Sequence, residues 1–134
     1  MKITTARRSA IAQSLVADMA TGTASPNSVM EIYTGTIPSM GVAISETLLG
    51  TLILTAAVAT ESAGVITFET ITEDTSADAT GRAGWCRVLD RDSSEAAYFT
   101  INDNGNGEIN FNSADIIAGS PIAITELTVT VGGE

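Results

Sequence analysis

The chain has 134 residues, a length typical of one domain, and it carries 16 acidic residues against 6 basic ones with no histidine, a formal net charge of −10. This charge disfavours nucleic acid and anionic membrane as partners, because phosphate binding requires lysine and arginine to replace counterions. Hydrophobic residues make up 44% and charged residues only 16% of the chain, which excludes disorder driven by charge.

An amphipathic helix is predicted over residues 4–21, within an N-terminal helical segment 1–22 of a single domain 1–134. Thr4 or Thr5 is expected to cap its start and Gly22 its end. The residues that recur at helical spacing on its apolar face are Ile11, Ala12, Leu15, Val16 and Met19.

Two arginines, Arg7 and Arg8, lie in the first turn of this helix. The helix dipole disfavours cations at that end. They are interpreted either as solvated side chains or as contacts to a partner.

Short apolar runs separated by turn residues fill residues 29–134 and predict many strands. The fold class is therefore expected to be mainly β, a jelly-roll-like sandwich of seven or eight strands with one N-terminal helix. The predicted runs are 29–34, 48–55, 65–71, 83–89, 97–101, 108–111 and 122–131.

Period-two alternation within these runs predicts which side chains face the core. The last run changes phase, and a bulge near Thr125 and Glu126 would reconcile its two halves. The predicted inward residues are Met30, Ile32, Ile66, Phe68, Cys86, Val88, Phe99, Ile101, Ile109 and Phe111.

The clearest turn signal is Asn104-Gly105-Asn106-Gly107, which favours the positive φ angles of hairpin turns. It predicts a hairpin that joins the run 97–101 to the run 108–111. The acidic stretch 73–81 is predicted to be an exposed loop.

Catalytic and metal-binding residue types are scarce. Without histidine and with Cys86 as the one cysteine, histidine triads, Cys-His dyads and ordinary zinc sites are excluded. A carboxylate pair, Asp74 with Asp78 or Asp90 with Asp92, could serve as acid and base, but both pairs lie among turn residues, where solvation opposes the raised pKa of a general acid. Residues 102–113 resemble an EF-hand loop but have Ser113 where the bidentate Glu belongs. We expect no enzyme, no cofactor and no metal.

One predicted strand carries residue types that favour a contact surface. Trp85, Arg87, Leu89 and Arg91 alternate onto one face, and Trp and Arg are enriched in interface hot spots. The alternative is that the N-terminal helix covers this face. The candidate partner contacts are Arg7, Arg8, Trp85, Arg87, Leu89 and Arg91.

Five segments together carry a resemblance to a known family: MKITTARR (1–8), EIYTGTIP (31–38), DTSADATG (74–81), WCRV (85–88) and TELTVTVG (125–132). They resemble small proteins of tailed bacteriophages, in particular virion proteins of the head that include jelly-roll cement or decoration proteins. The resemblance implies a protein made in the host cytoplasm that binds the major capsid protein on the outer surface of the head and stabilises the shell, as a dimer or trimer. A tail or tail-fibre component and a glycan-binding sandwich are the alternatives.

Overall fold

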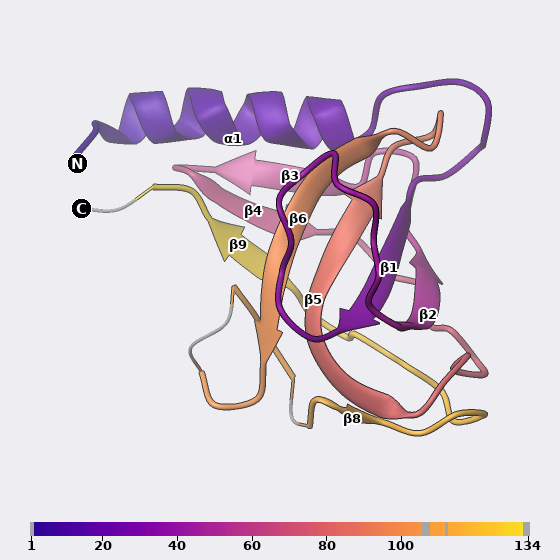
Figure 1. Cartoon of the computed structure of the whole chain (residues 1–134). Helices are drawn as coiled ribbons and strands as arrows, with labels where there is room; N and C mark the ends of the chain where they lie inside the picture. The colour runs from indigo at the N-terminus through magenta and orange to yellow at the C-terminus, as the bar shows by residue number, and fades with distance from the viewer. Residues whose placement is uncertain (1, 106–107, 112, 133–134) are drawn as a thin grey trace.

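The computed structural model describes residues 2–105, 108–111 and 113–132. In these residues one N-terminal helix, α1 (Thr5–Met19), precedes nine strands that form two sheets, so the protein is mainly β, as predicted (Figure 1). The strands of the larger sheet lie in the order β2 (Leu48–Ile53), β1 (Val29–Thr34), β5 (Gly81–Leu89), β6 (Glu95–Asn102) and β7 (Ile109–Asn110), and β8 (Asp115–Ile116) pairs with β5. The smaller sheet contains β3 (Ala59–Ser62), β4 (Val65–Phe68) and β9 (Thr128–Thr130).

Helix α1 begins where the sequence predicts. The Thr4 hydroxyl accepts a hydrogen bond from the backbone N–H of Arg7 at 3.3 Å and so caps the first turn. The apolar stripe is rotated from the expected one, because Ile11 is 50% exposed while Ala12 and Met19 are fully buried. A helix with the length and hydropathy of a membrane span is absent from the described residues.

The two sheets and α1 share one hydrophobic core. Across the core the rings of Phe68 in β4 and Phe99 in β6 meet edge to face, with centroids 6.3 Å apart. Nine of the ten residues predicted to face inward are buried, and Phe111 is half-buried against the same core. Consecutive strands pair as the hairpins β1–β2, β3–β4 and β5–β6, while jelly-roll connectivity stays a prediction.

The hairpin predicted between 97–101 and 108–111 is wrong. Strands β6 and β7 pair in parallel, with Ile101 opposite Ile109. The backbone N–H of Thr100 donates to the Glu108 carboxylate at 2.9 Å, and this bond holds the returning chain beside β6 before β7 begins. Asn106 and Gly107, part of the predicted turn, lie outside the described residues.

The predicted run 122–131 forms no continuous strand. Ile122 makes an isolated bridge to Asp74, and regular pairing resumes only in β9. The change of phase is therefore made by an irregular segment and not by a bulge. The apolar side chains of both halves are nevertheless buried, namely Ile122, Ile124, Leu127 and Val129.

Candidate functional site

The face of β5 that the sequence predicts as a contact surface is crossed by the loop between β1 and β2, residues 35–47, which we call the arm (Figure 1). At the tip of the arm, the backbone N–H of Gly41 donates a hydrogen bond to the Glu95 carboxylate at 3.3 Å. The base of the arm touches the strand backbone, since a Cβ on Gly84 would lie 1.9 Å from the carbonyl oxygen of Gly35. Only glycine fits at residue 84 while the arm keeps this course.

Trp85 lies within this face and is completely buried. Its ring stacks on Tyr33 with centroids 4.7 Å apart and lies 5.0 Å from Tyr98, and its Nε1–H donates to the carbonyl oxygen of Thr34 at 3.1 Å. The interpretation of Trp85 as exposed contact area is therefore wrong. The alternative cover was also misidentified, because α1 packs on β3, β4 and β6 while the arm crosses β5.

Arg87 is held between two carboxylates on the same face. Its Nε lies 2.6 Å from Glu31 and its Nη1 lies 3.0 Å from Glu95, and the side chain is only 20% exposed. Partial burial opposes the charge, but the hydrogen bond and charge of Glu31 raise the pKa of Arg87 above its ordinary value. Burial, together with the hydrogen bond to Glu31, raises the pKa of Tyr33 to about 12. Arg87 is therefore a structural residue that holds Glu31 and Glu95 on this face.

Leu89 and Arg91 are also engaged inside the protein. Leu89 is 9% exposed, and the half-buried Arg91 donates from Nε to the carbonyl oxygen of Ser25 at 2.8 Å. Arg91 thereby ties the linker after α1 to the end of β5. Neither residue offers a free surface for a partner.

The two helix arginines differ from each other. Arg8 is half-buried against the turn between β3 and β4, where a Cβ on Gly64 would lie 2.7 Å from the Arg8 Cβ. Arg7 is exposed, and Ile11 lies one turn further along α1, so both are on its outer face. Of the six candidate contacts, the structure leaves Arg7 at the surface and does not bring it together with Trp85.

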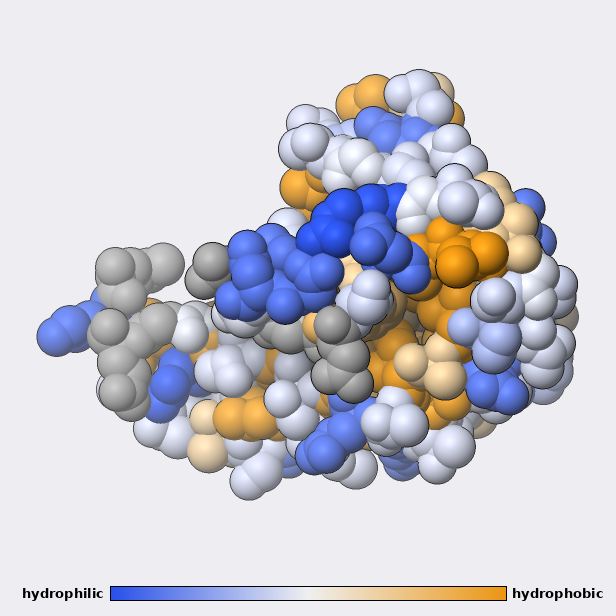
Figure 2. Space-filling view, turned by 90° about the horizontal axis from the view of Figure 1, so that it is seen from below, coloured by the Kyte–Doolittle hydropathy of each residue, from blue (hydrophilic) through white to orange (hydrophobic). Residues whose placement is uncertain are grey.

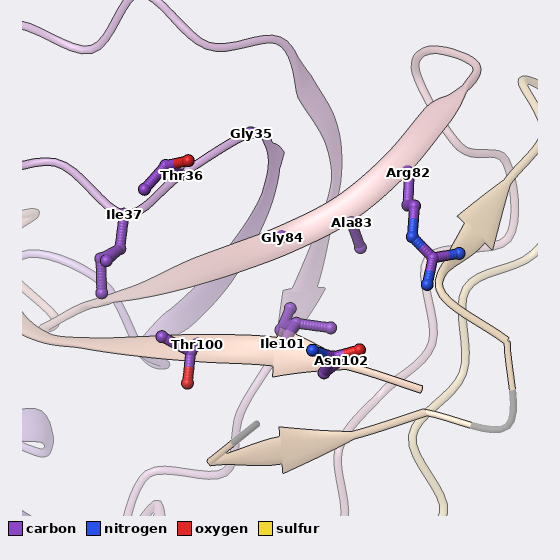
Figure 3. A pocket seen from close by; sticks show the side chains of 9 residues that line it. All are labelled: Gly35, Thr36, Ile37, Arg82, Ala83, Gly84, Thr100, Ile101 and Asn102. Atoms are coloured by element: carbon purple, nitrogen blue, oxygen red, sulfur yellow. The ribbon is translucent and has the colours of Figure 1, made fainter. Parts of the chain in front are cut away.

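A groove of about 660 Å³ lies between the base of the arm and the ends of β5 and β6 (Figure 3). Arg82 is the one ionisable residue in its lining, and it is paired with Asp103 at 2.5 Å and with Asp115 at 3.3 Å. The hydrogen bond from Arg82 lowers the pKa of Asp103. The groove offers contact area but no acid, base or activated nucleophile. Its lining is Gly35, Thr36, Ile37, Arg82, Ala83, Gly84, Thr100, Ile101 and Asn102.

Three of the four carboxylates named above as possible acid–base pairs, those of Asp74, Asp90 and Asp92, fasten loops instead. Asp74 accepts backbone N–H groups of Thr51 and Ser76, both at 3.0 Å, so the acidic loop is anchored to the edge strand β2. Asp90 accepts the N–H groups of its own turn, and Asp92 accepts two successive N–H groups of the linker after α1 at 2.8 and 2.9 Å. Hydrogen bonds from that linker lower the pKa of Asp92.

The remaining chemical groups are similarly placed. Cys86 is fully buried, and burial raises the pKa of its thiol, which makes it a packing residue rather than a nucleophile. Within the described part of the chain no three histidine, cysteine or carboxylate side chains are grouped as metal ligands.

What the sequence reasoning missed is the arm, whose side chains Met40 and Val42 are 53% and 54% exposed. A signal was present, because residues 36–45 carry no charge and mix apolar residues with Gly and Pro. No known family model matches the chain, and neither a curated protein nor a solved structure is significantly similar to it.

Proposed function

We propose that this chain is a non-enzymatic structural protein of a tailed-bacteriophage virion, which binds the outer surface of the major capsid protein lattice and reinforces the shell. The non-enzymatic part of this proposal rests on the direction in which the pKa values of the carboxyl groups are shifted. Every carboxyl group of the described residues whose pKa is perturbed is shifted downward, as in a group that holds structure, whereas a general acid needs an upward shift. The resemblance of the sequence to head decoration proteins supplies the partner.

A decoration protein must stay rigid while it is attached, and the loops of this chain are fastened accordingly. Glu61 joins α1 to the β3–β4 turn, because it accepts the Ser9 hydroxyl at 2.7 Å, the Gln13 amide at 3.2 Å and the Gly64 N–H at 2.8 Å. Such bonds between α1 and the β3–β4 turn fix the helix on the sandwich. The outer face of α1 is then a preformed surface, which lowers the entropy cost of binding.

The outer face of α1 is the capsid contact in this proposal. Arg7 presents a planar guanidinium suited to carboxylates of a lattice, and Ile11 adds apolar area one turn away. Each contact is worth about 1–2 kcal/mol on truncation, and attachment at several points multiplies such losses.

A glycan-binding sandwich, the alternative of another class, is not favoured. Carbohydrate binding uses exposed aromatic platforms. The aromatic residues here are buried or half-buried, namely Tyr33, Phe68, Trp85, Tyr98, Phe99 and Phe111.

The test adds purified protein to capsid shells that lack it and measures bound copies and resistance of the shells to heat. Wild type is expected to bind in hundreds of copies and to raise the temperature at which shells open. Arg7→Ala with Ile11→Ala should lower occupancy, while the matched variant Met40→Ala with Val42→Ala should leave it unchanged. Shells that bind no wild-type protein, or virions in which mass spectrometry finds a handful of copies at the tail, would contradict the proposal.

A further inference from the structure

The outer face of α1 carries one positive and one negative side chain, at opposite ends of the helix. Helix α1 lies along one side of the sandwich and packs on β3, β4 and β6 (Figure 1). At 3.6 residues per turn, Arg7, Ile11, Ser14 and Asp18 share the face that points away from these strands, and all four are exposed. Arg7 lies in the first turn and Asp18 in the last, about 16 Å apart along the helix axis.

Both charges stand at the end of α1 where the helix dipole disfavours them. The dipole favours anions in the first turn and cations in the last, but the first turn of α1 contains no acidic residue and the last turn no basic one. Within the described part of the chain, neither the Arg7 guanidinium nor the Asp18 carboxylate has an ion-pair or hydrogen-bond partner. The two side chains are therefore free to pair with charges of another molecule.

The surroundings of the two residues reinforce this polarity. Residues 1–17 hold three of the six basic residues of the chain and none of its sixteen acidic ones. At the other end of the helix, Asp18 lines a hollow of about 240 Å³ together with Asp90 and Glu95. One end of α1 therefore attracts anionic groups and the other end attracts cationic ones.

The opposite side of the molecule does not offer such a match. Figure 2 shows hydrophobic side chains on that side, interrupted by hydrophilic ones. The groove there is lined in part by Asp115 and Glu126, and with a net charge of −10 two copies repel each other wherever carboxylates face each other. The outer face of α1 instead brings charges of both signs to a contact, which offsets that repulsion.

We infer that the outer face of α1 binds the same face of a second copy of this chain, with the two helices antiparallel. This arrangement places Arg7 of each copy opposite Asp18 of the other, so two ion pairs form, and the two helix dipoles oppose each other favourably. Ile11, which is 50% exposed, then packs near Ser14 of the second copy, where the small side chain leaves room for it. A two-fold axis gives both copies the same contact and closes the assembly as a dimer.

The pairing does not depend on the proposed capsid role, although both use Arg7 and Ile11. In the presence of shells, the capsid and a second copy compete for this face, and that competition alone rests on the proposed function. One helix face buries a small area and exposed ion pairs are screened by salt, so the dimer is weak. Its mass is therefore measured by analytical ultracentrifugation in low salt, at protein concentrations up to about 1 mM.

Two charge reversals, Arg7→Glu and Asp18→Arg, each replace both ion pairs of the dimer by pairs of like charge. Each reversal also agrees with the helix dipole, so both variants should melt no lower than wild type. The dissociation constant of the dimer should rise by about tenfold or more in each. Glu73→Arg is the matched control, because it makes the same change of charge as Asp18→Arg at an exposed loop residue, and it should dimerise as wild type does.

Two samples are decisive. An equimolar mixture of Arg7→Glu with Asp18→Arg should form a heterodimer that neither variant forms alone, because each then meets the opposite charge on the other. The double variant Arg7→Glu with Asp18→Arg should pair with itself, since both ion pairs return with their charges exchanged. A wild type that is monomeric at every concentration, a control that fails to dimerise, or a mixture or double variant that stays monomeric would overturn the inference.

The double variant also separates this inference from the proposed function. It lacks the Arg7 guanidinium, so its occupancy on shells reports on the capsid contact, whereas its mass in solution reports on the pairing of helices. Restored pairing with wild-type shell occupancy would count against the capsid contact and leave the pairing standing. Lost pairing with lowered occupancy would overturn the pairing and leave the capsid contact standing.

Discussion

Trp85→Ala tests the central correction that the structure makes to the sequence-based interpretation. Trp85 is 0% exposed, stacked on Tyr33 and hydrogen-bonded to the carbonyl oxygen of Thr34. Truncation of a buried tryptophan costs about 3–5 kcal/mol, through lost transfer free energy and the cavity left behind. Set against the free energy of unfolding of a typical domain, about 5–15 kcal/mol, this is a large fraction. We expect a folded but weakened protein.

Trp85→Phe separates stacking from hydrogen bonding. The phenyl ring can still stack on Tyr33, but the carbonyl oxygen of Thr34 loses its donor, and such a loss costs about 1–3 kcal/mol when the group stays buried. The expected order of stability is wild type, then Trp85→Phe, then Trp85→Ala. Ile53→Ala is the matched control, because Ile53 is 45% exposed and its truncation should change stability by about 0.5 kcal/mol or less.

The assay is urea unfolding followed by far-ultraviolet circular dichroism, because the variants lack the only tryptophan and so have no common fluorescence probe. Hydrogen exchange at the Gly41 amide gives a second readout, since loss of the ring beneath the arm should speed exchange at its tip. A Trp85→Ala protein as stable as the Ile53→Ala control, with unchanged exchange at Gly41, would show that the indole lies in solvent and would refute this account of the face.

Three further predictions concern charged groups. Arg87→Met should destabilise the protein by about 2–3 kcal/mol, because two half-buried carboxylates lose their partner. In urea unfolding, the double variant with Glu31→Gln should recover part of that loss. Losses that simply add would contradict an interaction between the two residues. The pKa of Asp92 is lower in the folded than in the unfolded state, so its stabilisation is present above the unfolded pKa and is lost as the pH falls through the folded one. The melting temperature should therefore hold between about pH 7 and 5 and fall below about pH 4, with a shallower fall in Asp92→Asn, and a rise on acidification would argue against this role. Calcium should not stabilise the fold, because Asp103 in the EF-hand-like segment 102–113 already pairs with an arginine of β5. Melting curves with calcium and with chelator should therefore coincide, and a shift of several degrees would contradict this prediction.

The local signals in the sequence were sufficient for the main elements. Thr4 caps α1 as its hydroxyl predicts, and the first strand is observed over the predicted residues 29–34. The inward side chains of that strand, Met30 and Ile32, are buried because alternation along a strand is a property of the backbone alone. Short segments were missed, including β3 and β8, since a strand as short as Asp115–Ile116 has no period to detect.

The sequence by itself determined that the protein is mainly β, that the alternating apolar residues of its predicted strands face the core, and that it lacks histidine-based chemistry. Only the tertiary structure decided what covers the second face of β5, because a loop without periodicity carries no signal of where it packs. It likewise decided that β7 runs parallel to β6, since pairing depends on contacts between distant residues and not on the turn residues between them. For the same reason Trp85 and Arg87, whose residue types suggested a binding surface, belong to the interior, whereas Met40 and Val42 on the arm are among the exposed apolar groups.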